Sequence, residues 1–289
     1  MMELTSPNSD DYEFLDAGNG QRLERWGSYI LARPAAAAIW EKENHALWDR
    51  ADGVFERQRD GNGRWHMNRP LPAAWSIRWR GLQFRIKPTG FGHVGLFPEH
   101  ACHWDWVESQ IRAQTGPCRI LHLFAYTGAM SLHAAQVGAT VCHVDAVADI
   151  NEWARENARA SGLEAAPIRW ITDDAQKFAA REIRRQRFYE GLIFDPPSYG
   201  NGPNAEKWIL DEHLVPFLTL LPRLVADPPR FVLFTCHTLG FSPVLMKNLM
   251  APWIKRFGGK LEYGTMLLSA NPKASPLPSG FFARWSQST

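Results

Sequence analysis

From about Cys102 onward the chain alternates short apolar runs with longer amphipathic stretches. The apolar runs, which are typical of buried parallel strands, predict strands at 119–124, 140–145, 167–171, 189–195, 230–236, 260–268 and 280–285. The stretches between them predict helices near 103–115, 128–137, 148–161, 174–186, 206–225 and 242–256. Because parallel strands need crossover connections, this alternation predicts a doubly wound, mostly parallel α/β sheet. The last two strands have no helix between them, so we expect them to run antiparallel.

The first hundred or so residues follow a different pattern. Residues 12–33 place short apolar and aromatic runs around a Gly-Asn-Gly turn, which predicts two or three β-strands. Residues 75–87 alternate on either side of a two-residue turn, with apolar side chains on one face and basic side chains on the other. We therefore expect a small, aromatic-rich, mostly β domain at residues 1–100 and an α/β domain at residues 101–289.

Composition narrows the class of protein. No apolar run approaches the roughly 20 residues that a membrane-spanning helix needs, and the first residues are acidic and polar, unlike a signal peptide. The four cysteines are widely spaced and form no Cys-x-x-Cys pair, which favours free thiols in a reducing compartment. We expect a cytoplasmic protein. His122, His133 and His143 have no metal-ligand spacing with acids or cysteines, so we expect no metal.

Residues 119–128 (RILHLFAYTG) predict a buried strand that ends in a turn of small residues. Such a turn lets the backbone approach a ligand, and the next helix offers its N-terminal N–H groups. Gly128 is the one glycine of this stretch, whereas a dinucleotide fold would have GxGxxG, and no GxxxxGK[ST] is present for a triphosphate. The pattern therefore predicts a nucleotide-like ligand without a pyrophosphate.

Acidic residues follow the next two strands. Asp145 ends the strand at 140–145, where a carboxylate can accept both hydroxyls of a ribose; alternatively, it caps the following helix. Asp173 and Asp174 follow the strand at 167–171. One of them can cap the next helix while the other accepts an adenine amino group, and we favour Asp174 for the adenine.

Asp195-Pro196-Pro197 stands at the end of the strand at 189–195, at the sheet edge where α/β folds bind ligands. Two prolines remove two backbone donors and hold the chain extended, so that the carboxylate and the adjacent carbonyls point at a fixed place. A methyl transfer needs its nucleophile held in line within about 3 Å, so this rigidity suits a methyltransferase. The alternative is a Pro-Pro loop that merely leaves the strand.

Together these motifs resemble those of the class I S-adenosylmethionine-dependent methyltransferases, over about residue 90 to the C-terminus. More narrowly, they resemble the bacterial subgroup related to the large-subunit ribosomal RNA methyltransferases that modify cytosine C5 or guanine N7. LFAYTG is similar to the first cofactor motif, HVDAV to the acidic one, TDDAQKF to the adenine-side one and DPPSYG to the catalytic loop. GLFPEH is loosely similar to a GxFxxQ-like segment, with His100 in place of glutamine.

The resemblance implies a Rossmann-like seven-stranded sheet of order 3-2-1-4-5-7-6, with strand 7 antiparallel, and S-adenosylmethionine as the cofactor. It implies a catalytic role for Asp195, Pro196 and Pro197. The cofactor-binding residues that it implies are Phe97, His100, Phe124, Ala125, Tyr126, Thr127, Gly128, Asp145, Ala146, Asp174 and Asp195.

Cys236 is a further catalytic candidate. In cytosine-C5 enzymes a cysteine thiolate adds to C6 of the base, and Cys236 stands near where the relatives keep theirs. The neighbouring His237 could depress the thiol pKa, although adjacent residues of a strand point to opposite faces. The alternative is a structural role, since free cysteine is commonly buried.

The acceptor molecule is less closely specified. The segment 64–87 joins tryptophans to six basic residues and has no acid, which suits RNA: cations for phosphates and aromatic rings for bases. The alternative is a half-buried hairpin with a solvated basic face. We expect RNA, with ribosomal RNA first, although no PUA-like RNA-binding domain can be recognised in residues 1–100. A protein or small-molecule methyltransferase, and a non-catalytic RNA-binding protein on a degenerate fold, stay open. Homodimers are common among the relatives, and nothing in the sequence requires one.

Overall fold

The computed structural model describes residues 1–58, 63–113, 115–204, 206–269 and 275–287. The chain forms two compact units. The α/β unit comprises Met1–Glu3, His103–Thr265 and Gly280–Thr289, and the β unit comprises Leu4–Cys102 and Met266–Ser279. The sequence predicted an α/β domain at residues 101–289. The α/β unit differs from it chiefly at 266–279, where the ends of the last two strands group with the β unit.

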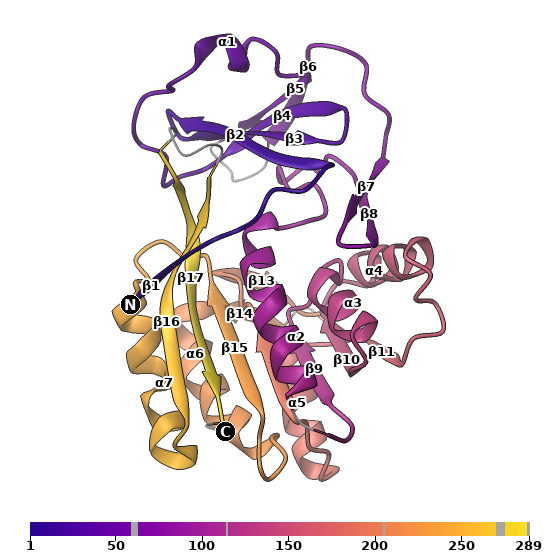
Figure 1. The fold of residues 1–289 in the computed structure, drawn as a ribbon, viewed down its shortest axis with the longest axis vertical. Coiled ribbons are helices and arrows are strands. Elements are labelled where there is room, and N and C mark those ends of the chain that lie inside the picture. The colour runs from indigo at the N-terminus through magenta and orange to yellow at the C-terminus, as the bar shows by residue number, and fades with distance from the viewer. Residues whose placement is uncertain (59–62, 114, 205, 270–274, 288–289) are drawn as a thin grey trace. The chain divides into compact units, whose positions relative to one another are not determined.

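One eight-stranded sheet forms the centre of the α/β unit (Figure 1). Its strands are β1 (Met2–Thr5), β9 (Arg119–Leu123), β10 (Thr140–Asp145), β11 (Ile168–Thr172), β12 (Gly191–Phe194), β15 (Phe231–Cys236), β16 (Lys260–Leu268) and β17 (Leu277–Ser286). Their order in the sheet is β1-β16-β17-β15-β12-β9-β10-β11. Strands β9, β10, β11, β12 and β15 pair in parallel, and β17 pairs antiparallel with β15.

The expected order 3-2-1-4-5-7-6 is therefore confirmed, with one addition. The sheet has an eighth strand, β1, which lies at its edge beside β16. At four residues, β1 is too short to show a period in the sequence, and its pairing with β16 depends on contacts across most of the chain.

Helices cover both faces of this sheet (Figure 1). They are α2 (Trp104–Arg112), α3 (Ala129–Gln136), α4 (Ala148–Ala160), α5 (Ala175–Arg184), α6 (Leu210–Leu220) and α7 (Pro243–Phe257), with the 3-10 turn η2 (Leu221–Arg223) after α6. Residues of α5, α6 and α7 share one apolar core with the central strands, and this core includes Phe178, Phe217 and Met250. The predicted helices are thus present, but α6 begins later than expected because a ribbon of β13 (Tyr199–Asn201) and β14 (Lys207–Ile209) precedes it.

The β unit contains a five-stranded sheet of order β2-β3-β4-β5-β6 and a separate hairpin, β7-β8. The elements of this unit are β2 (Tyr12–Gly18), β3 (Gln21–Trp26), β4 (Tyr29–Pro34), α1 (His45–Trp48), β5 (Gly53–Arg57), β6 (Gly63–Met67), β7 (Trp75–Trp79) and β8 (Leu82–Ile86). The 3-10 helix η1 (Pro98–His103) follows β8 along the chain. Its core holds a buried ionic cluster in which Glu24 accepts hydrogen bonds from Tyr12 at 3.0 Å and from Arg33 at 2.7 Å.

The hairpin of residues 75–87 forms as predicted. Arg80 and Gly81 have φ of +51° and +78°, the left-handed pair that suits the twist of a two-residue hairpin turn. Ile77 pairs with Phe84 on the buried face, while the basic side chains stand on the exposed face. The tryptophans of this region face inward: Trp79 is 2% exposed, and the Trp75 indole donates to the carbonyl of Trp26 at 2.9 Å.

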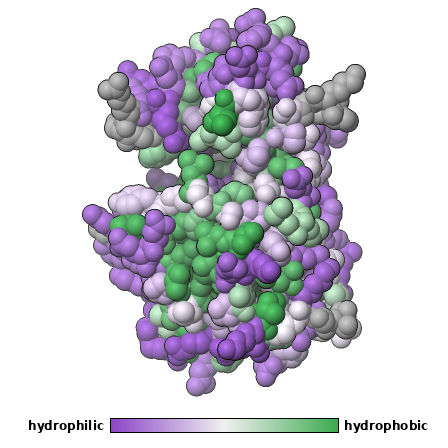
Figure 2. Space-filling view, turned by 90° about the vertical axis from the view of Figure 1, so that its left-hand side faces the viewer, coloured by the Kyte–Doolittle hydropathy of each residue, from purple (hydrophilic) through white to green (hydrophobic). Residues whose placement is uncertain are grey.

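The surface of the α/β unit is mixed in polarity. Figure 2 shows apolar residues gathered on one face, with hydrophilic residues around them. Large apolar side chains at its surface include Val215 of α6 and Val244 of α7. Within the described residues, no helix combines the length and the apolar character needed to cross a membrane.

Candidate functional site

The turn after β9, residues 124–128, has an irregular backbone that is held by the next strand. Phe124 and Tyr126 have φ of +55° and +50°, and Gly128, the residue before α3, has φ of +86°. The Ala125 N–H donates to the carbonyl of Val144 at 3.1 Å. Gly128 also lies close to α4, because a Cβ there would come within 3.2 Å of the Ala154 Cβ. We call this segment the 124–128 turn.

Asp145 binds the 124–128 turn directly. One carboxylate oxygen accepts the Tyr126 N–H at 2.8 Å, and the other accepts the Val147 N–H at 3.1 Å. Burial raises the pKa of this carboxyl, and the backbone N–H groups partly offset that effect. The N-cap position of α4 belongs to Val147, so Asp145 is not its capping residue. The Ala146 N–H is a third backbone group that acts on this carboxyl.

Asp174 and Asp173 have different hydrogen-bond partners at the start of α5. Asp174 is the N-cap of α5, where its Oδ1 accepts the Lys177 N–H at 2.8 Å. Asp173 accepts the Asp174 N–H at 2.9 Å and pairs with Arg181. The residue favoured for adenine therefore caps the helix with one carboxylate oxygen.

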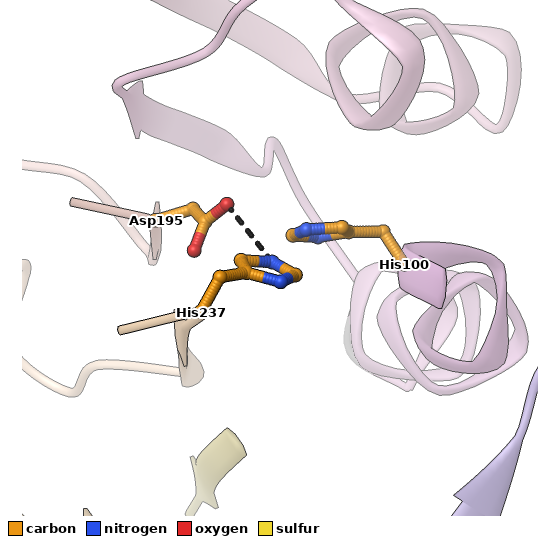
Figure 3. Close-up of side chains that lie close together, drawn as sticks. All are labelled: His100, Asp195 and His237. Carbon is orange, nitrogen blue, oxygen red and sulfur yellow. Dashed lines mark ion pairs between the residues drawn. The ribbon is translucent and has the colours of Figure 1, made fainter. Parts of the chain in front are cut away.

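The Pro-Pro loop, residues 195–198, leaves the end of β12 and meets the residues that follow β15. Oδ2 of Asp195 lies 3.4 Å from Nε2 of His237, as Figure 3 shows. Oγ of Ser198 lies 2.7 Å from Oγ1 of Thr238. Because β12 and β15 are parallel neighbours, their carboxyl ends bring these two loops together.

Trp208 is a site residue that sequence reasoning missed. It lies in β14, 4% exposed, and its indole N–H donates to the Pro197 carbonyl at 2.7 Å. Its ring centroid is 4.9 Å from that of Phe124 in the 124–128 turn. A large aromatic residue among polar residues, soon after DPPSYG, could have pointed to this role. The sequence pattern instead predicted a helix at 206–225, which includes Trp208.

Cys236 lies at the end of β15 inside the apolar core of the α/β unit, and its exposure is 0%. Burial raises the pKa of its thiol to about 11, and the nearby Asp195 carboxylate also raises it. The attacking species in covalent catalysis is the thiolate. The position of Cys236 therefore favours the structural alternative.

A buried polar chain lies beneath the 124–128 turn. Oγ of Ser131 is 2.7 Å from Nδ1 of His122 and 2.9 Å from Nδ1 of His143. Burial, and secondarily His122, hold the pKa of His143 well below its usual value, so His143 stays neutral. Cε1 of His143 is 3.5 Å from where a Gly128 Cβ would lie, so this chain packs under the turn.

Phe97 and His100 belong to the β unit. His100 lies in η1, and Phe97 precedes it. Their ring centroids are 6.2 Å apart, and the Phe97 ring also meets His93 at 5.1 Å. The remaining expected site residues belong to the α/β unit: they lie at or just after the ends of β9, β10, β11 and β12, and Cys236 ends β15.

Comparisons with known proteins identify the family. The model of a family described as S-adenosylmethionine-dependent methyltransferase matches residues 31–244. The chain belongs to this family. It is therefore an S-adenosylmethionine-dependent methyltransferase, as its motifs imply, and S-adenosylmethionine is its cofactor.

Solved structures agree with this assignment. A methyltransferase of the same kind from Agrobacterium tumefaciens is 35% identical, with a TM-score of 0.95 over 100% of this chain and 94% of that chain. A methyltransferase complexed with SAH has a TM-score of 0.72 at 16% identity, over 95% of this chain and 75% of that chain, which shows the shared fold.

Curated relatives are ribosomal RNA methyltransferases by name. The ribosomal RNA large subunit methyltransferase K/L of Shewanella frigidimarina is 32% identical over 127 residues, which is 44% of this methyltransferase and 17% of that protein. The protein of the same name from Shewanella sp. strain W3-18-1 is 30% identical over 154 residues, or 53% and 21% of the two chains. The match thus spans only about a fifth of these relatives' length.

Proposed function

We propose that this methyltransferase transfers a methyl group from S-adenosylmethionine to a base of ribosomal RNA. The observation that carries the proposal is the Pro-Pro loop at the carboxyl end of β12, two strands from Asp145 in the sheet. The names of the curated relatives support ribosomal RNA as the acceptor. The exposed basic face of the β7-β8 hairpin supports a polyanion. Trp79 is buried and Trp75 is half-buried, so the hairpin would contribute phosphate contacts rather than stacking on bases.

The residues of the α/β unit fit the cofactor. In the proposal, the 124–128 turn holds the methionine portion, with Ala146 beside it. Asp145 accepts the two ribose hydroxyls with the same carboxylate that accepts the Tyr126 and Val147 N–H groups. Asp174 accepts the adenine amino group with the oxygen that does not cap α5.

The Pro-Pro loop positions the acceptor in this proposal. The cofactor supplies an electrophilic methyl group. Asp195 and the carbonyls of Pro196 and Pro197 orient the acceptor atom in line with that methyl, so that positioning supplies most of the catalysis. Cys236 takes part as a nucleophile only if the acceptor is cytosine C5, and its burial favours an acceptor that needs no covalent step.

The test uses ribosomal RNA from a strain that lacks this gene. That RNA should lack one methylated nucleotide, and the purified enzyme with labelled S-adenosylmethionine should restore it. The Asp195→Ala variant should bind the cofactor and transfer no methyl. If RNA from the deletion strain carries the full wild-type set of methylated nucleotides, the acceptor is a protein or a small molecule instead.

A further inference from the structure

The indole of Trp208 joins two parts of the site that are far apart in the sequence. Its ring packs against Phe124, the first residue of the 124–128 turn, at a centroid distance of 4.9 Å. Its N–H donates to the carbonyl of Pro197 in the Pro-Pro loop at 2.7 Å. Trp208 is 4% exposed, so its side of both contacts is shielded from water, whereas Pro197 lies at the surface and the hydrogen bond is partly buried.

The Pro-Pro loop depends on such outside support. Its two prolines have no backbone N–H, so the loop cannot join a strand ladder through them. The peptide bond between Pro197 and Ser198 is planar and trans, so a hydrogen bond that fixes the Pro197 carbonyl also fixes the direction of the Ser198 N–H. Trp208 therefore sets the orientation of the peptide that follows the two prolines.

The ribbon that carries Trp208 is itself tied to the adenine side of the site. Trp208 pairs with Gly200 across the β13-β14 ribbon. Oε1 of Glu206, next to β14, lies 2.6 Å from Nζ of Lys177, which stands in the first turn of α5, the helix that Asp174 caps. An ion pair therefore connects the segment beside the ribbon to α5.

We propose that Trp208 is a positioning residue that couples the 124–128 turn to the Pro-Pro loop. Phe124 sets the place of the indole ring, and the indole N–H sets the Pro197 carbonyl beside the transferring methyl. The loop is then ordered for transfer when the turn is occupied. This inference rests on the proposed roles of the two segments.

The decisive variant is Trp208→Phe, which keeps an aromatic ring and removes the N–H donor. Trp285→Phe is a matched control, because Trp285 is 0% exposed and donates its indole N–H to the Gly258 carbonyl at 2.6 Å, outside the site. Hydrogen exchange followed by mass spectrometry reports on residues 195–201 without any acceptor. Loss of one buried hydrogen bond should speed exchange there about fivefold in Trp208→Phe and leave it unchanged in Trp285→Phe.

Saturating SAH tests the coupling. In the wild type it should slow exchange in both 124–128 and 195–201, whereas in Trp208→Phe the slowing should be confined to 124–128. With ribosomal RNA as acceptor, kcat of Trp208→Phe should fall about tenfold or more while KM for S-adenosylmethionine changes less than about twofold. Equal exchange at 195–201 in Trp208→Phe and the wild type, or an equal change in Trp285→Phe, would overturn the inference. A wild-type enzyme that methylates no RNA would overturn the proposed acceptor, while the exchange measurement would still decide the role of Trp208.

Discussion

The 124–128 turn and the Pro-Pro loop lie at the ends of neighbouring parallel strands, yet they are held in different ways. The N–H groups of Ala125 and Tyr126 donate to β10, and the Asn157 side chain of α4 donates to the Thr127 carbonyl at 3.0 Å. The Pro-Pro loop is instead held by segments that follow it: the side chains of Trp208, His237 and Thr238 contact it, and the Leu210 N–H donates to the Ser198 carbonyl at 3.0 Å. The neighbouring strand β10 and helix α4 therefore hold the cofactor side of the site, whereas β14, the start of α6 and the residues after β15 hold the acceptor side.

Asp145 offers the strongest test of this comparison, because its carboxylate accepts the Tyr126 N–H of the turn. Asp145→Ala should lower the affinity for SAH by about 100-fold or more, since two hydrogen bonds to a charged group are lost. Asp145→Asn, which keeps one acceptor oxygen, should bind with intermediate affinity. Calorimetric titration with SAH measures both. Unchanged binding by Asp145→Ala would mean that Asp145 does not hold the ribose.

A substitution at Gly128 tests how much the left-handed backbone and the close packing of the turn contribute to stability. Gly128→Ala should cost about 2 kcal/mol or more of unfolding free energy, from the left-handed backbone and the close Ala154 Cβ. Gly162→Ala is the control: its φ of +69° is also left-handed, but nothing lies within 4 Å. It should cost only about 1 kcal/mol in denaturant unfolding and leave SAH affinity unchanged. Equal costs for the two variants would show that packing against α4 contributes nothing.

The buried support of the turn should make stability depend on pH. The pKa of His143 is depressed in the folded protein, so below about pH 6.5 the unfolded state binds a proton that the folded state does not. Stability should therefore fall as the pH drops below this value, by up to about 1.4 kcal/mol per pH unit from this residue, and His143 should add no slope above it. His143→Gln should remove that part of the slope in urea unfolding between pH 5 and 7. The same slope in His143→Gln and in the wild type would show that another residue is responsible for the pH dependence.

Cys236 provides the smallest expected effect, on the acceptor side. Cys236→Ala should leave turnover within about twofold of the wild type, because a protonated core thiol does not act as a nucleophile. The variant should lose about 1 kcal/mol of stability from the small cavity. Complete loss of turnover in a folded Cys236→Ala protein would instead restore covalent catalysis at cytosine C5.

Local patterns account for most of what could be predicted. Apolar runs and amphipathic stretches give the order of strands and helices, and the alternation of residues 75–87 gives the hairpin and its buried face. The motifs around Gly128, Asp145 and Asp195 identify the cofactor because each is carried by a few adjacent residues. These features can be predicted from the sequence because they depend on the period of the backbone and on the order of the strands along the chain.

Tertiary structure decided the rest, because it depends on contacts between residues far apart in the chain. The edge strand β1, the β13-β14 ribbon and the place of Trp208 between Phe124 and Pro197 have no local signature. Composition suggested tryptophans that stack on bases, and the family resemblance suggested a reactive Cys236. Burial, a property of the packed chain, places Trp79 in the core and raises the pKa of the Cys236 thiol. The cofactor could be read from consecutive residues, whereas the support of the acceptor loop could be read only from the fold.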